Sequence, residues 1–329
     1  MTIELFDCTI RDGGSVVGGG TTVSVAVTVV EGLIASGLTR IEIGNTYSMG
    51  EAGRAKCAPG TPTDDEYLAG VQPYVKKAGL GMFVHPAMAK TSDLEKAKAN
   101  GLTFVRIGSN VGSVRGAAET IKAARDFGLE TRFSLMKSYA ATAEQLADDA
   151  RAVVDMGAQI VHVMDSTGSF FPDEVSRYFG VLRQAVKEPL GFHGHNNLGL
   201  AVANAIAAHK AGVNILDCSV GGYARSAGNA PTEMLAVVFD RLGIKTGVDV
   251  FGLLDFIEKK GAPALNPPNC VAALDVVFGM AGFHSSFAKT AKAAAEKRGV
   301  SLHRLICEVC KIDKVNPSDA LFAEVAEKL

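Results

Sequence analysis

The sequence alternates between two kinds of segment, and this alternation constrains the fold more than any other feature. Short runs of β-branched and aromatic residues, almost continuously apolar, are each followed by a longer amphipathic run. Continuous apolar runs are typical of parallel strands that are covered on both faces. They predict strands over residues 3–8, 40–44, 81–85, 104–108, 131–136, 160–164, 191–193 and 215–219.

The longer runs carry apolar residues at i, i+3, i+4 and i+7, which is the pattern of a helix with one buried face. Glycine follows many of them, where a helix commonly ends in a left-handed conformation. Eight strand–helix units in about 240 residues predict an α/β fold, a (β/α)8 TIM barrel. The predicted helices cover residues 22–36, 63–77, 92–99, 117–127, 142–156, 173–186, 198–211 and 231–242.

A doubly wound sheet is the alternative fold. No GxGxxG motif follows a predicted strand with an acidic residue about 20 positions later, so the dinucleotide-binding pattern is missing. The glycines between residues 13 and 20 also lack the Gly-Lys-Ser/Thr ending of a phosphate-binding loop. The sequence therefore favours the barrel.

The pattern changes after residue 247, where helical runs follow one another with no strand between them. These runs cover residues 250–259, 269–281, 285–298, 302–310 and 317–328. We therefore predict a catalytic barrel over residues 1–247 and a small helical subdomain over residues 248–329.

Charge and hydropathy exclude several classes of protein. Lys plus Arg number 33 and Asp plus Glu number 35, without long basic runs, so nucleic-acid binding is not expected. No stretch of roughly 18 apolar residues is free of charge, so we expect no membrane span. The first residues carry Glu4 and Asp7 and no basic segment, unlike a signal peptide. Six scattered cysteines are typical of free thiols, and we expect a cytoplasmic protein.

Candidate metal ligands follow the first and seventh predicted strands. In a barrel, chemistry takes place at the carboxyl ends of the strands. Arg11 and Asp12 follow the first strand in what we expect to be a glycine turn, and His193 and His195 have the i, i+2 spacing that directs both side chains to one side of a strand. Two imidazoles and one carboxylate predict a divalent metal with open coordination positions. Asn229, in the glycine-rich loop after the eighth strand, is a weaker candidate ligand.

These motifs resemble a known superfamily. The DxTxRDG motif of residues 7–13, HxHN at residues 193–196 and the glycines before Asn229 resemble the TIM-barrel metallolyases typified by 3-hydroxy-3-methylglutaryl-CoA lyase and 2-isopropylmalate synthase. Residues 193–204, 228–233 and 281–287 look like those of 4-hydroxy-2-oxovalerate aldolases. The resemblance spans nearly the whole chain.

The resemblance implies a class II aldolase, a carbon–carbon lyase that cleaves a 4-hydroxy-2-oxo acid to pyruvate and an aldehyde. Its divalent metal, usually Mn2+ with Mg2+, Co2+ or Zn2+ as alternatives, would be held by Asp12, His193 and His195. Arg11 matches the arginine that binds substrate and stabilises the enolate of pyruvate. Asp165 and Ser166 match an Asp-Ser pair that positions substrate or supports the site.

Two positions depart from the aldolase pattern. The aldolases have a catalytic histidine where this chain has Ser15, and a tyrosine where this chain has His284. Cleavage requires a base for the C4 hydroxyl, and serine has no useful pKa for that role. We hypothesise that His284 performs the proton transfer from the tail.

Two other functions stay open on the sequence. A Claisen-type synthase would join an acyl-CoA to a 2-oxo acid with the same metal and arginine. A metal-binding homologue without aldolase activity would fit the loss of histidine at Ser15. Resemblance in the tail also permits an acylating aldehyde dehydrogenase as a partner, and we expect a homo-oligomer.

Overall fold

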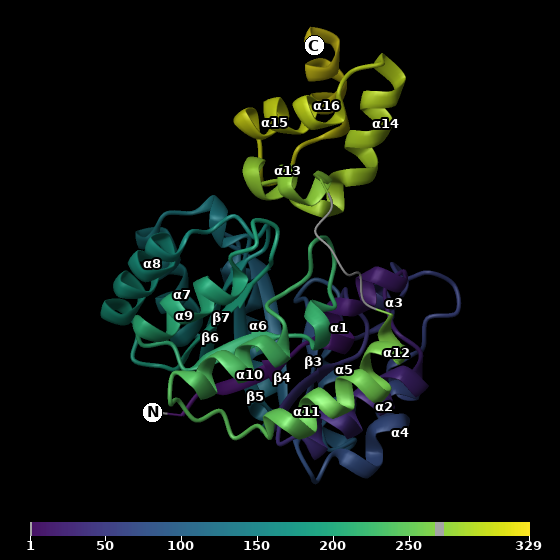
Figure 1. Cartoon of the computed structure of the whole chain (residues 1–329), viewed down its shortest axis with the longest axis vertical. Coiled ribbons are helices and arrows are strands. Elements are labelled where there is room, and N and C mark those ends of the chain that lie inside the picture. The colour runs from purple at the N-terminus through teal and green to yellow at the C-terminus, as the bar shows by residue number, and fades with distance from the viewer. Residues whose placement is uncertain (1, 267–272) are drawn as a thin grey trace.

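The computed structural model describes residues 2–266 and 273–329, and its centre is a closed barrel of parallel strands (Figure 1). Each strand pairs with its sequence neighbours, and β1 closes the barrel by pairing with β8. The predicted TIM barrel is confirmed, with every strand within two residues of its expected bounds. The strands are β1 (Glu4–Asp7), β2 (Arg40–Ile43), β3 (Gly79–Val84), β4 (Phe104–Asn110), β5 (Glu130–Met136), β6 (Ile160–Asp165), β7 (Leu190–Gly194) and β8 (Ile215–Cys218).

Helices surround the barrel and cover the outer faces of the strands (Figure 1). Several begin at a threonine cap. Thr142, for example, accepts a hydrogen bond from the Gln145 backbone, while the Gln145 side chain accepts one from the Thr142 backbone. The barrel helices are α1 (Thr9–Gly13), α2 (Val23–Ala35), α3 (Glu51–Arg54), α4 (Asp64–Val71), α5 (Thr91–Ala99), α6 (Ala118–Asp126), α7 (Ala143–Asp155), α8 (Pro172–Ala185), α9 (Ala201–Lys210) and α10 (Thr232–Arg241).

Two local expectations were wrong. The helix predicted over residues 63–77 ends as α4 at Val71 and continues as the 3-10 turn Gln72–Tyr74, because Pro73 has no N–H to extend an α-helix. Arg11 and Asp12 do not lie in a glycine turn. They lie on the short helix α1, which includes Gly13 in a right-handed conformation.

Charged residues fill the interior of the barrel and are paired there. Arg106 and Arg132 are among the largest fully buried side chains. Arg132 pairs with Glu4 and Glu130, at 2.6 and 2.7 Å, toward the amino ends of the strands. Buried guanidinium groups require such partners, because an unpaired buried charge is strongly unfavourable.

The end of the chain forms a second, smaller hydrophobic core around Phe278, Phe283 and Phe322. Figure 1 shows these helices, in yellow, as a separate body beyond one end of the barrel. We call the segment from residue 273 to residue 329 the tail. Its helices are α13 (Ala273–Ala281), α14 (Ala288–Arg298), α15 (Leu302–Ile312) and α16 (Asp319–Lys328).

Packing assigns the first helices after residue 247 to the barrel. Phe256 of α11 (Val250–Phe256) lies where any side chain on Gly32 of α2 would clash. Leu265 of α12 (Ala262–Leu265) also belongs to the barrel's hydrophobic cluster. The division of the chain at residue 247 stays a prediction. The start of the helix predicted over 269–281, with Cys270, lies outside the described residues.

Hydrogen bonds join the tail to loops at the carboxyl ends of the strands. Lys137 Nζ donates to the carbonyl of Val315 at 2.5 Å, and the Tyr139 hydroxyl donates to the carbonyl of Lys314 at 3.1 Å. Ser226 Oγ donates to Asp275 Oδ1 at 2.7 Å. The tail therefore lies over the mouth of the barrel.

Across the described ranges 2–266 and 273–329, no helix combines the length and the apolar character needed to cross a bilayer.

Candidate active site

Helix α1 positions Asp12 at the mouth of the barrel. The Asp12 backbone N–H donates to the Cys8 carbonyl at 2.9 Å, so the chain turns into a helix directly after β1. A Cβ atom at Gly13 would lie 2.2 Å from the Tyr223 ring, so only glycine permits this approach. Asp12 Oδ1 accepts from Arg11 Nη1 at 3.0 Å, and Oδ2 accepts from Asn229 Nδ2 at 2.9 Å.

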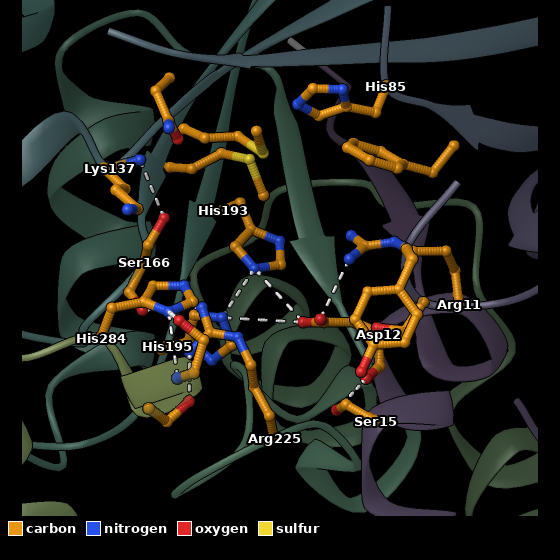
Figure 2. A pocket seen from close by; sticks show the side chains of 18 of the residues that line it. Arg11, Asp12, Ser15, His85, Lys137, Ser166, His193, His195, Arg225 and His284 are labelled. Atoms are coloured by element: carbon orange, nitrogen blue, oxygen red, sulfur yellow. Dashed lines mark hydrogen bonds and ion pairs between the residues drawn. The ribbon is translucent and has the colours of Figure 1, made fainter. Parts of the chain in front are cut away.

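The two histidines of β7 and its continuation converge on the same carboxylate, as Figure 2 shows. Asp12 Oδ2 lies 3.5 Å from His193 Nε2 and 3.7 Å from His195 Nε2. The two Nε2 atoms lie 3.3 Å apart. The structure thus brings together three of the predicted metal ligands from opposite ends of the barrel sequence.

The hydrogen-bond partners of the two imidazoles decide which nitrogens face the centre. His193 Nδ1 lies 2.9 Å from Asp217 Oδ2, and His195 Nδ1 lies 3.1 Å from the Gly228 carbonyl. Both partners are acceptors, so each Nδ1 carries the hydrogen and each Nε2 presents a lone pair. Two lone pairs and a carboxylate at this separation repel one another unless a cation lies between them. The donor set therefore fits a divalent metal ion.

Two further features agree with a metal at this position. Burial by itself would raise the pKa of Asp12, but the positive charge of Arg11 holds that pKa well below its usual range. Asn229 Oδ1 is buried and has no hydrogen-bond partner in the described structure. Asn229 presents its nitrogen to Asp12, and its oxygen is the atom that an ion would require.

Asp217 of β8 supports the metal ligands from behind. Besides His193, it contacts His162 Nδ1 at 3.1 Å and forms an ion pair with Arg106. Burial would raise the pKa of Asp217, but Arg106 and His162 hold it well below its usual range. A carboxylate behind a ligating histidine fixes its tautomer and orientation.

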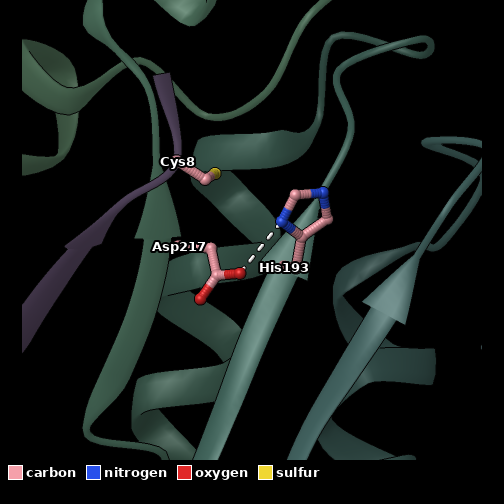
Figure 3. A group of neighbouring side chains, drawn as sticks. All are labelled: Cys8, His193 and Asp217. Atoms are coloured by element: carbon pink, nitrogen blue, oxygen red, sulfur yellow. Dashed lines mark hydrogen bonds and ion pairs between the residues drawn. The ribbon is translucent and has the colours of Figure 1, made fainter. Parts of the chain in front are cut away.

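Cys8 lies beside His193 and Asp217, and the three form a second candidate ligand group (Figure 3). The Cys8 thiol donates to the Cys218 carbonyl at 3.2 Å, and burial raises its pKa well above its usual value. His193 Nδ1 faces Asp217 directly, as the dashed line in Figure 3 marks. This group therefore supports the site described above and is not a separate metal site.

Arg11 is held rigidly beside Asp12. Its Nε donates to Glu42 Oε2 at 2.7 Å, and Glu42 also accepts from Arg106 at 3.5 Å. Burial alone would lower the pKa of Arg11, but Glu42 and Asp12 raise it above its usual value. Nη2 of Arg11 is buried without a partner among the described residues, so one donor is left for a ligand.

A cavity of about 440 Å³ at the mouth of the barrel is lined by Arg11, Asp12, His193 and His195. Phe83, Met136 and Met164 form an apolar part of its wall. The tail completes the cavity with three consecutive residues, which are His284, Ser285 and Ser286. The tail is thus part of the site.

His284 can adopt either neutral tautomer. Its Nδ1 accepts from the Ser286 backbone N–H at 3.2 Å and lies 2.7 Å from Ser286 Oγ, which can donate or accept. Burial and the neighbouring charges of Arg225 and Lys137 lower the pKa of His284 well below its usual value. The imidazole is therefore neutral at physiological pH.

The other predicted site residues separate into two groups. Ser15 and Ser166 line the cavity. The Ser15 hydroxyl donates to the Asp12 carbonyl at 2.6 Å, and Ser166 Oγ accepts from the Lys137 backbone at 3.0 Å. Asp165 does not line it. Its buried carboxylate accepts from the backbones of Ser169 and Phe170, and burial raises its pKa to about 6.

Sequence reasoning missed the roles of Asp217 and Arg225. Asp217 is a lone carboxylate in a buried apolar strand, and that isolation was the available signal. Arg225 lines the cavity and is the only charged residue between Val220 and Asn229. A single charge in a glycine-rich loop at a barrel mouth indicates contact with a ligand.

Fold and side-chain geometry together define a TIM-barrel protein with a candidate Asp-His-His metal site at the carboxyl ends of its strands. The chain belongs to the HMGL-like family, whose sequence model matches residues 2–258.

Curated relatives match over nearly the whole chain. The 4-hydroxy-2-oxovalerate aldolase 2 of Nocardia farcinica is 33% identical and covers 100% of this chain and 94% of its own length. The 4-hydroxy-2-oxovalerate aldolase of Geobacillus thermodenitrificans is 33% identical, with coverage of 99% and 95%. The solved HMG-CoA lyase of Brucella melitensis aligns with a TM-score of 0.68 at 19% identity, over 80% of this chain and 99% of that one, and shares the fold.

Proposed function

We propose that this protein is a divalent-metal-dependent class II aldolase that cleaves a 4-hydroxy-2-oxo acid to pyruvate and an aldehyde, or runs the reverse condensation. One observation carries the proposal. The facing lone pairs of His193 and His195 meet the Asp12 carboxylate beside a guanidinium, inside a cavity that also holds a neutral imidazole. Relatives that carry the name 4-hydroxy-2-oxovalerate aldolase at 33% identity support the same reaction.

Cleavage breaks the C3–C4 bond of the substrate and needs two things from the protein. The C4 hydroxyl loses a proton as the aldehyde forms, and the bonding electrons move to the 2-oxo group as an enolate. Protonation at C3 then gives pyruvate, so no oxidant or reductant is required. A divalent ion held by Asp12, His193 and His195 supplies a Lewis acid for the 2-oxo group.

Arg11 stabilises the developing enolate. Its charge is fixed by Glu42 and Asp12, so it does not need to reorganise during the reaction. Its unpartnered Nη2 supplies a hydrogen-bond donor for the oxyanion. The same donor binds the 2-oxo acid in the ground state.

His284 transfers the proton at C4. Cleavage requires the tautomer in which Nδ1 gives up the backbone bond and donates its hydrogen to Ser286 Oγ, so that Nε2 presents a lone pair and acts as a base. With Nδ1 accepting from the Ser286 backbone, Nε2 carries the hydrogen and acts as an acid for condensation. Ser15 donates its own hydrogen to the Asp12 carbonyl, so it does not substitute for the base.

Ser166 and Asp165 contribute in different ways. Ser166 contacts substrate from the wall of the cavity. Asp165 holds the loop after β6 by accepting two backbone N–H bonds, and so it positions Ser166. Mn2+ suits the mixed nitrogen and oxygen ligand set, with Mg2+, Co2+ or Zn2+ as alternatives and Asn229 as a weaker further ligand.

Two expectations about the wider context accompany the proposal. Because the tail forms part of the cavity wall, an acylating aldehyde dehydrogenase that docks on the tail would receive the aldehyde there. We also expect a homo-oligomer. The described cysteines are all free thiols, which supports a reducing compartment such as the cytoplasm.

The test is pyruvate release from racemic 4-hydroxy-2-oxovalerate by the purified protein loaded with Mn2+, coupled to lactate dehydrogenase. Exchange of the pyruvate C3 protons in D2O provides a second readout of enolate formation. We expect both activities to require metal. Exchange without cleavage would limit the proposal to enolate chemistry, and the absence of both, or release of thiol from an acyl-CoA, would overturn it.

A further inference from the structure

The cavity contains a second cationic position that the proposed reaction does not use. Arg225 lies in the loop after β8 and donates from Nη1 to Ser285 Oγ at 3.0 Å and from Nη2 to the Ser166 carbonyl at 2.7 Å. Figure 2 places Ser166 and His284 on one side of the histidine pair and Arg11 on the other. Arg225 thus bridges the barrel and the tail on the side opposite Arg11.

Arg225 has no ion-pair partner within contact distance among the described residues, in contrast to Arg11. Arg11 forms ion pairs with Asp12 and Glu42. Within residues 2–266 and 273–329, Arg225 forms no ion pair, and its two hydrogen bonds go to neutral oxygens. A guanidinium has five N–H donors, so it keeps free donors in a fork that matches a carboxylate.

Lys137 adds a second cation on the same side of the cavity. Its Nζ donates to the neutral carbonyl of Val315 at 2.5 Å, and it forms no ion pair in the part of the chain that the structure describes. Burial lowers its pKa. Neither cation forms an ion pair with a described residue, and Asp12, the one carboxylate among the residues that line the cavity, is already paired with Arg11, so the two cations attract an anionic ligand.

An uncommon backbone conformation occurs at Lys137 and directly after Arg225. Lys137 has φ +57°, and Ser226, directly after Arg225, also has φ +57°. Non-glycine residues at positive φ are uncommon, and such strain is concentrated where function needs a fixed geometry. Hydrogen bonds hold both residues in place, from the Lys137 backbone to Ser166 Oγ and from Ser226 Oγ to Asp275.

We propose that Arg225, together with Lys137, binds a second carboxylate on the aldehyde half of the substrate, so that the enzyme acts on 4-hydroxy-2-oxo dicarboxylic acids. The inference rests on the proposed function, because it places the 2-oxo acid end at Arg11 and the metal ligands. The bonds that break and form are the same as in the reaction proposed above. Cleavage releases pyruvate and an aldehyde that itself carries a carboxylate.

The first test measures binding without turnover. 2-Oxoadipate and 2-oxohexanoate have the same chain length, lack the C4 hydroxyl and differ in the terminal carboxylate. We expect calorimetry on the Mn2+-loaded protein to give a Kd at least about tenfold lower for 2-oxoadipate, which is a typical gain for a charged hydrogen-bonded contact. Equal affinities for the two acids would overturn the inference.

Variants separate ligand recognition from a structural bridge. Arg225→Gln should remove the preference for 2-oxoadipate, and Arg225→Lys should retain part of it because the charge remains. Ser285→Ala removes a partner of Arg225 but keeps the guanidinium, so the preference should persist. If Arg225 only joined the tail to the barrel, Arg225→Gln would weaken both ligands equally, and the ratio of their affinities would not change.

The second test uses turnover and distinguishes failure of the inference from failure of the proposed function. We expect cleavage of 4-hydroxy-2-oxoheptanedioate with a kcat/KM at least about tenfold above that of 4-hydroxy-2-oxoheptanoate. Cleavage of both with no preference would retain the aldolase and overturn the inference. Cleavage of neither, together with tight 2-oxoadipate binding, would overturn the aldolase and retain the anion site. Tighter binding of a matched acid that ends in phosphate would overturn the assignment to a carboxylate.

Discussion

The two sides of the cavity are built in opposite ways. On the barrel side, Asp12, Arg11 and His193 are backed by Asp217 and a further buried ion pair between Arg106 and Glu42, so every charge has an opposite partner. We call this the barrel wall. On the tail side, Lys137, Arg225 and His284 are held by neutral oxygens and backbone groups. We call this the tail wall.

This difference matches two different tasks. Fixed dipoles and paired charges stabilise a transition state that is common to all substrates of a reaction class. Cations without an ion-pair partner instead bind an anionic substituent that only some of those substrates carry. In our proposal the barrel wall therefore serves the step common to all substrates, whereas Arg225 and Lys137 of the tail wall select the substrate.

The largest effect on turnover should come from replacing Asp12, the central residue of the barrel wall. Asp12→Asn removes the charged ligand and should lower turnover by at least about 10³-fold, because Lewis-acid assistance and oxyanion stabilisation are lost together. Pyruvate release and bound Mn2+ should fall together. The exposed Asp126→Asn serves as control, and retention of Mn2+ by Asp12→Asn would contradict the ligand assignment.

Sequence patterns were sufficient to predict the barrel and the convergence of Asp12, His193 and His195. Continuous apolar runs located all eight strands because buried parallel strands are apolar on both faces, and the i, i+2 spacing of His193 and His195 placed both imidazoles on one side of an extended segment. Asp217 and Arg225 could not be placed in the same way. Their roles depend on contacts with β7 and the tail, which are distant in sequence and set only by barrel closure and tail docking.

The next effect tests the support behind the barrel wall. Asp217→Asn removes one of the two carboxylate partners of the buried Arg106. Because a buried charge that loses its partner is strongly unfavourable, we expect the free energy of unfolding to fall by about 3–5 kcal/mol. Loss of the carboxylate behind His193 should also weaken Mn2+ binding about 10–100-fold. Urea unfolding and Mn2+ titration measure the two effects.

A matched control is Asp148→Asn, which removes an exposed ion pair with Arg151 and should change stability by no more than about 1 kcal/mol. Equal losses in the two variants would show that burial does not distinguish these ion pairs.

The pH dependence of stability should differ between the two sides. Burial raises the pKa of Asp7, beneath the barrel wall, to about 7, and that of Asp165, beneath the tail wall, to about 6. A raised folded pKa means stability that is complete below the ordinary value near 3.8 and is lost as pH rises through the folded value. The upper limits are about 4 and 3 kcal/mol respectively, at about 1.36 kcal/mol per pKa unit.

Asp7→Asn should therefore remove a decline in stability that begins near pH 4 and ends near pH 7, whereas Asp165→Asn should remove one that begins near pH 4 and ends near pH 6. Thermal unfolding between about pH 3 and about pH 9, which includes the whole affected range, measures both. Identical profiles for the two variants would contradict the assignments.

Removing the proton-transfer group should affect the tail wall alone. His284→Ala should lower kcat about 10²-fold, the lower range for loss of a general acid–base group, while Mn2+ affinity stays unchanged because His284 is not a ligand. His303→Ala provides a control on an exposed histidine of the same tail. Full turnover by His284→Ala would exclude the proposed role.

The smallest effect should come from loosening the contact between the two sides. Tyr139→Phe removes the hydrogen bond to the Lys314 carbonyl and should cost about 1 kcal/mol, expressed as faster amide exchange in the tail. Tyr178→Phe removes an equivalent bond to Ala141 within the barrel and should leave tail exchange unchanged. The same exchange rate in both variants would contradict a role for Tyr139 in docking.

Tail docking has a consequence for the history of such enzymes. Because His284, the proposed proton-transfer residue, lies on a unit with its own hydrophobic core, substitutions there can exchange one acid–base group for another without disturbing the buried charges of the barrel. Substitutions in the tail can therefore change the substrate during evolution, while the barrel retains the groups that stabilise the common enolate. His284 in the tail and Ser15 after α1 are the pair of residues that such an exchange would produce.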